Sequence, residues 1–372
     1  MKKILYINGQ EFNFDTKYIS QIGAWKSLGY KAEYFKLFRT VESLREVIRE
    51  IRKFDLIYLR HGYGLDRVWF LIYPFLKEKN LILEFPSPIS SLYSDIKTNN
   101  ELGYIKKKVI YLLYKFYIKM ILPKVDLIIE MAEEKDEEVL KYKGKIYLWQ
   151  NGLNSIELYK INENYLHYQS QTIKKFVEKK EFHLVFIANK LYLHHGLDRL
   201  IHGLINFYQN KNDSNYLIKL HIVCSKTVLI EKFKKVILKN NLDKEIIFSD
   251  HMPIEKLQEV YKTANFCIGC LGLHRVDMQE ATPLKTREAT LMGLPSCISY
   301  HDYDLSKSDF IINLPKDDSP IDINLLIKFY SKLITKYGED LNQIIHEFAV
   351  HNLTWQKKVE LLEDECKKRE LL

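Results

Sequence analysis

The chain has 372 residues, of which 47% are hydrophobic and 28% are charged. This composition argues against a disordered chain, and the length favours two domains over one. The formal net charge of +8 is well short of that of a dedicated nucleic-acid binder. The five cysteines are few and odd in number, which argues against a disulfide scaffold and favours a reducing, cytosolic compartment.

Apolar stretches in this sequence are too short to cross a membrane. The first, residues 4–7, lacks the length of a signal-peptide core and suits a buried strand. The longest, residues 109–122, is interrupted by Lys115 and Lys119 and falls short of the ~20 residues that a spanning helix needs. We therefore expect a protein that does not cross a membrane.

Short apolar runs alternate with amphipathic stretches in the first part of the chain, which predicts a parallel sheet with helices on both faces. The predicted strands are residues 4–8, 32–37, 56–60, 81–84, 127–130 and 146–149. The predicted helices include residues 18–28, 43–53 and 67–77. Asn151-Gly152 then breaks the pattern, and the polar stretch to about residue 180 is predicted to be a linker, partly helical.

The same alternation resumes in the second part. The predicted strands are 182–188, 218–224, 245–249, 265–271 and 296–299, and the predicted helices are 197–209, 227–239, 254–262 and 283–292. A charged helix is expected from His351 to the end. The prediction is an α/β chain of two Rossmann-like, doubly wound domains, residues 1–165 and 178–350, facing each other across a cleft. Helix 351–372 would join the first domain, and ligands would bind at the carboxyl ends of the strands.

The segment 267–299 is the most typical of a ligand site. Thr282 is predicted to cap a helix, Pro283 to occupy its first position and Gly293 to end it. The first N–H groups of a helix have no intrahelical acceptor and carry partial positive charge. The sequence therefore predicts an anion site at the start of this helix.

Charged side chains surround the predicted helix start. The ammonium of Lys285, with the N–H groups of Leu284, Lys285 and Thr286, suits a phosphate. Glu288 would lie roughly 7–8 Å further along, at 1.5 Å per residue, where a carboxylate can accept hydrogen bonds from ribose hydroxyls. Glu280 precedes the helix, on the side where a sugar beyond a diphosphate would lie.

Four segments together resemble a known family. Glu280 and Glu288 enclose seven residues, the E-x7-E pattern of retaining GT-B glycosyltransferases of the group 1, family-4 kind. IGCLGLHR (268–275), LKTREATLMGLP (284–295) and FIANKLYLHHGLDRLIHGL (186–204) are similar to motifs of a bacterial surface-polysaccharide branch. Asn151-Gly152 also matches, and DLIYLRHGYG (55–64) and LILEFPSPI (81–89) do so more weakly.

The resemblance implies roles for individual residues. Glu288 would bind ribose and Glu280 would lie near the donor sugar. The amides of Leu284, Lys285 and Thr286, with Arg275, would contact the donor phosphates. Lys190 and His195 stand where the family has an arginine and a lysine that grip the leaving diphosphate, and a histidine there is a weaker, pH-dependent substitute.

The resemblance also implies an activity. A hexosyl group would pass from a nucleoside-diphosphate donor, bound by the C-terminal domain, to an acceptor bound by the N-terminal domain, with retention of configuration. Positive groups would stabilise the departing phosphate, so neither a metal nor another cofactor is expected. The acceptor would be a glycan or an undecaprenyl-linked glycan in capsule or other surface-polysaccharide synthesis, at the cytoplasmic face of the cell membrane.

The evidence for acceptor binding in the first half is weaker. Gly9, His61 and Glu84 follow or end predicted strands, which suits acceptor contact and turn chemistry equally. Residues 101–125 contain six lysines and one glutamate. They fit a solvated basic helix or one that rests on anionic lipid equally well. No recognition module for nucleic acid accompanies them.

Several alternatives stay open. The two glutamates, taken alone, are typical of solvated acids at a helix start. Cys267-x-x-Cys270 lies in an apolar strand without a second pair, which favours buried small side chains over a metal site, and Asp302-Tyr303-Asp304 is predicted to be a loop. A non-catalytic partner of another transferase and a sugar-nucleotide 2-epimerase are the rival functions.

Overall fold

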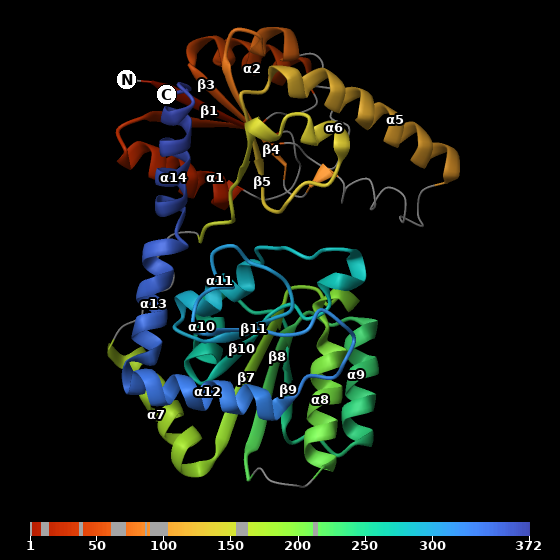
Figure 1. Cartoon of the computed structure of the whole chain (residues 1–372), viewed down its shortest axis with the longest axis vertical. Helices are drawn as coiled ribbons and strands as arrows, with labels where there is room; N and C mark the ends of the chain where they lie inside the picture. The colour runs from red at the N-terminus through yellow and green to blue at the C-terminus, as the bar shows by residue number, and fades with distance from the viewer. Residues whose placement is uncertain are drawn as a thin grey trace. The chain divides into compact units, whose positions relative to one another are not determined.

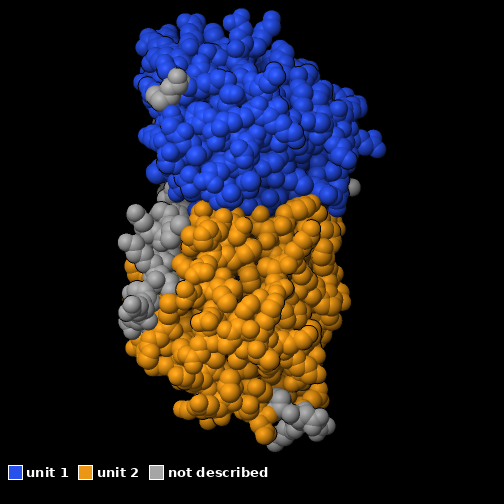
Figure 2. Space-filling model, turned by 60° about the vertical axis from the view of Figure 1, so that its left-hand side comes forward, with its two compact units in different colours: residues 1–154, 355–372 blue, residues 155–354 orange. Residues whose placement is uncertain are grey.

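The computed structural model describes residues 2–8, 15–36, 40–60, 72–85, 88–89, 103–153, 163–210 and 215–372. The chain divides into two compact units, coloured separately in Figure 2. Unit 1 comprises residues 1–154 and 355–372, and unit 2 comprises residues 155–354. Each unit is built around its own sheet, with helices packed on both faces (Figure 1).

The described part of unit 1 contains a six-stranded sheet in which every pairing is parallel. Its strands run in the order β2-β1-β3-β4-β5-β6, so the order reverses between β1 and β3. Buried apolar residues on both faces of the strands explain their near-continuous hydrophobic runs. The strands are β1 (Lys3–Asn8), β2 (Lys31–Lys36), β3 (Leu56–Arg60), β4 (Asn80–Phe85), β5 (Leu127–Glu130) and β6 (Ile146–Leu148).

Helices cover each face of this sheet with a separate apolar cluster. One cluster joins the sheet to α1 and α14, and the other joins it to α2 and α5. The predicted helix 67–77 is only partly described, and its described end is a 3₁₀ turn, η1 (Tyr73–Leu76), with Pro74 in its first turn. The α-helices of unit 1 are α1 (Asp15–Ser27), α2 (Val41–Lys53), α5 (Tyr104–Ile121), α6 (Glu137–Leu140) and α14 (Trp355–Lys368).

The C-terminal helix, α14, packs on the rest of unit 1, with Trp355 lying closely beside Gly152. A Cβ atom on Gly152 would lie only 2.5 Å from the ring of Trp355, so a larger residue would displace the indole that begins α14. Trp149 donates from Nε1 to the carbonyl of Lys358 at 2.7 Å. The charged helix expected from His351 starts at Trp355 as α14, and residues 351–352 are the end of α13.

In unit 2, the described residues form a second six-stranded parallel sheet, in the order β12-β11-β10-β7-β8-β9. Counted from β7, this is the doubly wound order, with its reversal between β7 and β10. The two parallel sheets with flanking helices confirm the predicted α/β architecture. The strands are β7 (Glu181–Ala188), β8 (Leu217–Cys224), β9 (Ile246–Ser249), β10 (Phe266–Ile268), β11 (Ser296–Ile298) and β12 (Ile311–Asn313).

Most of the polar stretch predicted to be a linker is a packed helix, α7. Phe176 of this helix lies 5.3 Å from the ring of Phe182 and 4.7 Å from that of Tyr330, between ring centroids. These contacts bury its apolar face in the core of unit 2. The helices of unit 2 are α7 (Glu163–Lys179), α8 (Leu197–Gln209), α9 (Val228–Lys239), α10 (Ile254–Lys262), α11 (Leu284–Leu291), α12 (Ile323–Tyr337) and α13 (Leu341–Asn352).

None of the helices in the described part of the chain is both long and apolar enough to cross a bilayer.

Candidate functional site

A cavity of about 720 Å³ lies at the carboxyl end of the sheet in unit 2. Its walls come from the ends of β7 and β8, from the loops after β9 and β10, and from the first turn of α11. The reversal of strand order between β7 and β10 lies at this edge, the usual ligand position in such sheets. The lining residues are Ile187, Ala188, Asn189, Lys190, Tyr192, His195, Val223, His251, Met252, Pro253, Ile254, Leu257, Cys270, Pro283, Leu284, Lys285 and Glu288.

The start of α11 forms one wall without a side-chain cap. Pro283 is the N-cap residue and Leu284 the first helical residue, so the predicted helix start was one residue too early. The prediction that Thr282 caps this helix is wrong, because the chain is still extended at Pro283 and no side chain accepts a capping hydrogen bond. The first N–H groups of α11 therefore remain available to an anion at this wall.

Lys285 brings a positive charge to the cavity. Its Nζ atom is buried and has no hydrogen-bond acceptor in the described structure. It lies 4.5 Å from the centroid of the Phe186 ring, which attracts the cation through its π-electron face. A buried ammonium without an acceptor carries a desolvation cost that a bound anion would remove.

His195 supplies a neutral donor beside this charge. It closes the 3₁₀ turn η5 (Leu193–His195), where its Nδ1 accepts the backbone N–H of Tyr192 at 3.2 Å. Burial, with the nearby charge of Lys285, lowers the pKa of His195 to about 3. The imidazole is therefore neutral at pH 7, and because Nδ1 accepts, its proton is on Nε2.

Lys190 and Glu288 complete the charged lining of the cavity. Lys190 is exposed at the end of β7, with Nζ 5.5 Å from the centroid of the Tyr192 ring. Glu288 follows Leu284 by one helical turn, so both side chains lie on the cavity face of α11. Cations, N–H groups and one carboxylate thus meet in one cavity, an arrangement suited to a phosphorylated ligand that also carries hydroxyl groups.

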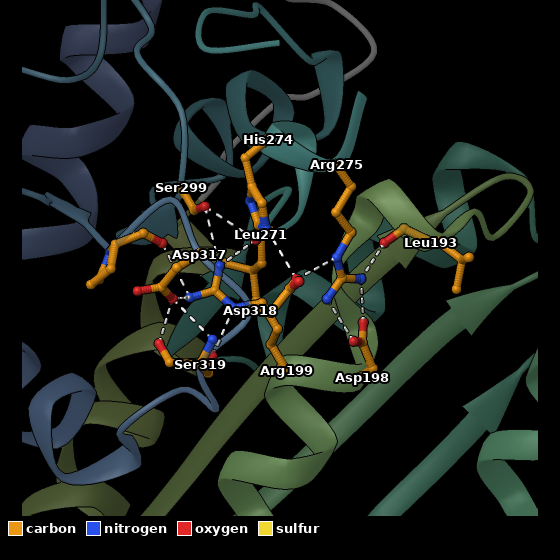
Figure 3. Close-up of polar contacts among 11 residues, drawn as sticks. Leu193, Asp198, Arg199, Leu271, His274, Arg275, Ser299, Asp317, Asp318 and Ser319 are labelled. Carbon is orange, nitrogen blue, oxygen red and sulfur yellow. Dashed lines mark hydrogen bonds and ion pairs between the residues drawn. The ribbon is translucent and has the colours of Figure 1, made fainter. Parts of the chain in front are cut away.

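Arg275, which was expected to contact phosphate, is not among the described residues that line the cavity. Its guanidinium donates to both carboxylate oxygens of Asp198, at 2.9 and 2.7 Å, and to Asp318 at 2.7 Å (Figure 3). It also donates to the carbonyl of Leu193 at 2.7 Å. These contacts fasten the turn that carries His195, so Arg275 acts as a positioning residue.

Arg199, next to Asp198 in α8, makes a second set of contacts (Figure 3). It donates to the carbonyls of Leu271, Pro315 and Ser319 and to the carboxylate of Asp317. The sequence analysis did not identify this residue. Arg199 follows β7 in the chain and its partners follow β10 and β12, so one buried guanidinium connects three segments of unit 2.

Glu280 is not among the described residues that line the cavity. Its backbone pairs with His301 in an isolated bridge, and its Oε1 accepts the hydroxyl of Tyr303 at 2.9 Å. Tyr303 belongs to the predicted loop Asp302-Tyr303-Asp304, whose two carboxylates hold the buried Arg287 of α11 at 2.8 and 2.7 Å. This loop therefore supports α11 from the side. The Thr286 side chain also lies there, hydrogen-bonded to Tyr300 at 2.9 Å.

Three solved structures resemble the chain over nearly its whole length. A glycosyltransferase from Rickettsia africae aligns with a TM-score of 0.64 at 11% identity, covering 99% of this chain and 98% of that one. The catalytic domain of Arabidopsis thaliana starch synthase IV, bound to ADP and acarbose, gives 0.63 at 8% identity with 99% of each chain covered. Anabaena HepE, in complex with UDP and glucose, gives 0.59 at 11% identity, covering 99% and 100%.

The chain has the GT-B fold. This confirms the architecture that the resemblance implied. No protein-family model matches the sequence, and no curated protein matches it either. At identities this low, the likeness establishes the GT-B architecture, and the activity has to be argued from the site.

In unit 1 of this GT-B chain, the acceptor-side predictions have different outcomes. Gly9 and His61 lie outside the described residues. Glu84 is completely buried, contacting Lys17 at 2.6 Å and Arg60 at 3.5 Å, and accepting the Tyr58 hydroxyl at 2.8 Å. Burial would raise the pKa of Glu84, but the two cations outweigh burial and hold the pKa below its ordinary value. Its carboxylate is therefore ionised inside the unit.

The cavity also contains residues that the sequence analysis missed. His251, Met252 and Pro253 follow β9, and Leu257 belongs to the helix after them. Their only sequence signal was a proline directly before a predicted helix, at the carboxyl end of a predicted strand. Cys267 and Cys270 are buried free thiols, as predicted. Among the described residues, no group of three or more His, Cys, Asp or Glu could hold a metal ion.

Proposed function

We propose that this protein is a retaining glycosyltransferase. It would transfer a hexosyl group from a nucleoside diphosphate to a glycan or an undecaprenyl-linked glycan, in bacterial capsule or other surface-polysaccharide synthesis. The observation that carries the proposal is the cavity of unit 2. There Lys285, the uncapped start of α11 and Glu288 meet at the carboxyl edge of a GT-B sheet.

The donor diphosphate would bind at the start of α11. Its oxygens would accept hydrogen bonds from the N–H groups of Leu284, Lys285 and Thr286, from the Nζ atoms of Lys285 and Lys190, and from Nε2–H of His195. Glu288 would accept hydrogen bonds from both ribose hydroxyls. The base would then lie against the apolar side chains of the cavity.

Transfer would proceed by stabilisation of the leaving group. As the bond from the anomeric carbon to the phosphate oxygen breaks, negative charge accumulates on the diphosphate, and Lys190 and Lys285 stabilise it. His195 contributes a hydrogen bond without charge. The chemistry assigned to these residues needs no metal ion, and Glu280 would act near the sugar once donor and acceptor are bound.

The acceptor would bind unit 1, at Gly9 and His61, which follow β1 and β3 in the chain. A lipid-linked acceptor would place the reaction at the cytoplasmic face of the cell membrane, with contact to anionic lipid through residues 101–125. The six lysines of this segment support such contact, because they would be attracted to anionic headgroups.

The first experiment is a thermal-shift series with UDP, GDP, ADP and CMP, each with and without Mg²⁺. Saturation at 100 times Kd adds about 2.7 kcal/mol of stability, which is a measurable shift. A shift with one nucleotide identifies the donor class, and transfer from sugars of that base then tests the activity. Isomerisation of the donor without an acceptor would favour an epimerase. No shift with any nucleotide would favour a non-catalytic partner.

A further inference from the structure

Helix α5 of unit 1 presents an apolar face to solvent. Ile105, Val109, Leu112 and Phe116 are spaced by four, three and four residues, so they form one stripe along the helix. Their side chains are 78%, 48%, 55% and 58% exposed, although apolar residues at this spacing normally face a core. Figure 1 shows α5 running away from the sheet of its own unit, with its N-terminal end farthest from the strands.

Among the described side chains of α5, those buried in the core belong to its last turns. Ile118 and Ile121 are 1% and 2% exposed and belong to the apolar cluster of this face of the sheet. A shallow hollow at the other end is lined by residues 103–106, 109 and 110. Contiguous exposed apolar surface of this kind marks an interaction site in soluble proteins.

Lysines flank the apolar stripe. At 100° per residue, Lys108, Lys115 and Lys119 lie along one edge of the stripe, and Lys106 lies on the other edge. The helix contains no acidic residue. The hydrogen bond with Tyr111, followed by the charges of Asp136 and Glu138 at the start of α6, raises the pKa of Lys115. Lys106 and Lys108 form no ion pair in the described structure, so the N-terminal half of α5 carries uncompensated positive charge.

We propose that α5 lies in the surface of an anionic lipid bilayer, with the stripe of Ile105, Val109, Leu112 and Phe116 inserted among the acyl chains. The flanking lysines then reach the lipid phosphates, as in helices that lie flat in a membrane interface. A second copy of the chain is the less favourable occupant, because two such helices would bring their lysine rows together. The inference rests on the proposed function only in that a lipid-linked acceptor requires access to a membrane.

The test uses the full chain without donor or acceptor, so it is independent of transfer activity. Co-sedimentation with vesicles of 30% phosphatidylglycerol in phosphatidylcholine is compared with pure phosphatidylcholine, at 0.1 and 0.5 M salt. We expect binding to the anionic vesicles and at least tenfold weaker binding to the neutral ones. Leu112→Glu/Phe116→Glu should weaken anionic binding at least tenfold, and Lys106→Glu/Lys108→Glu should do the same at 0.1 M salt.

The control is Leu238→Glu, which places the same charge on a 65% exposed leucine of unit 2 and should bind like the wild type. Circular dichroism melting of each variant separates a loss of folding from a loss of binding. Because every substituted side chain is exposed, we expect the variants to fold. Unchanged binding by Leu112→Glu/Phe116→Glu overturns the proposal, as does the lack of binding to any vesicle. A concentration-dependent dimer that the same variant dissociates, without vesicle binding, would identify a second copy as the occupant. A nucleotide-induced thermal shift that persists alongside failed vesicle binding would leave the transfer proposal standing.

Discussion

Arg275 and Asp198 are joined by two parallel hydrogen bonds of 2.9 and 2.7 Å, although 77 residues separate them in the chain. The pair connects η6 (Leu273–Val276) to the first turn of α8. A backbone bond from Leu271 N–H to the His195 carbonyl, at 3.1 Å, connects the residues just before these two elements. His195 is therefore positioned by a clamp whose members do not touch the cavity.

The first prediction concerns this clamp. Arg275→Lys keeps the charge but loses the two-point contact with Asp198. We expect about 1–3 kcal/mol of lost stability and donor binding weakened up to about tenfold, because the His195 turn loosens. Asp198→Asn should give a similar loss, and the double variant should lose less than the sum. Additive losses would show that the two residues act separately. Lys336→Met, at an exposed ion pair, is the control.

Lys285→Met separates binding from stability. The variant removes a buried ammonium that has no hydrogen-bond acceptor, so the thermal midpoint should not fall. Loss of a charge-assisted contact should weaken nucleotide binding about 10- to 100-fold. Calorimetric titration with the nucleotide that gives a thermal shift measures the second effect. A variant that melts earlier and binds normally would assign Lys285 to the structure of unit 2 instead of to the ligand.

The two glutamates should have different kinetic effects. Glu288 lines the cavity, so Glu288→Ala should raise the nucleotide Kd about 10- to 100-fold. Glu280 lies outside that lining, and Glu280→Ala should lower kcat at least tenfold while leaving Kd within about twofold. Glu347→Ala, an exposed site on α13, serves as the control. Wild-type kinetics in both variants would contradict the site assignment.

His195 should not titrate near neutrality. Burial, followed by Lys285, places the pKa of His195 at about 3, below the ordinary 6.5, so the ring should remain uncharged from pH 8 to pH 5. Lowering the pH from 8 to 5 would then give His195 no positive charge with which to bind a diphosphate. The Cε1 resonance of labelled histidine, assigned with His195→Asn, should stay fixed. In the Lys285→Met variant, this resonance should begin to shift at a higher pH than in the wild type. A midpoint near pH 6.5 in the wild type would disprove the neutral-donor role.

The ion pairs of the buried Glu84 make part of the stability of unit 1 dependent on pH. The folded pKa of Glu84 lies below the ordinary value, so its contribution is present above about pH 4.5 and is lost as pH falls through the folded pKa. Glu84→Gln leaves Lys17 and Arg60 buried without their shared carboxylate, which should cost about 3–5 kcal/mol at pH 7. The variant should also lose the part of the decrease in unfolding free energy at low pH that comes from Glu84.

Tryptophan fluorescence follows this unit selectively, because Trp25, Trp69, Trp149 and Trp355 all belong to unit 1. The control is Glu50→Gln, which breaks an exposed pair with Lys53 and should cost under about 1 kcal/mol. Equal losses in the two variants would mean that the burial of Glu84 contributes nothing.

The strands and helices were predictable where local pattern alone decides them. The strands 56–60 and 127–130 and the helices 197–209 and 254–262 have the predicted bounds, because apolar spacing and flanking polar residues define both ends. The break between α13 and α14 falls at residues 353–354, inside the stretch that the sequence analysis took as one charged helix from His351, because charge and apolar spacing continue across it.

The residues of the site were likewise predictable only where the local sequence decides their position. Lys285 and Glu288 could be predicted because a single short helix carries both of them. His251 and Met252 come from another strand, and no spacing in the sequence connects them to α11. Arg275 was expected at the phosphates, since the sequence shows its charge but not the distant carboxylates that bind it.

The chain leaves unit 1 at residue 154 and returns to it only at residue 355. Val359, Leu362 and Cys366 of α14 fill the same apolar cluster as Ile4 and Tyr58, at the centre of the first sheet. On the ribosome, all of unit 2 is therefore synthesised before the last piece of unit 1 exists. Until α14 is made, the face of the N-terminal sheet shared by α1 and α14 lacks part of its cover, and this interval exposes the nascent chain to aggregation and to chaperones.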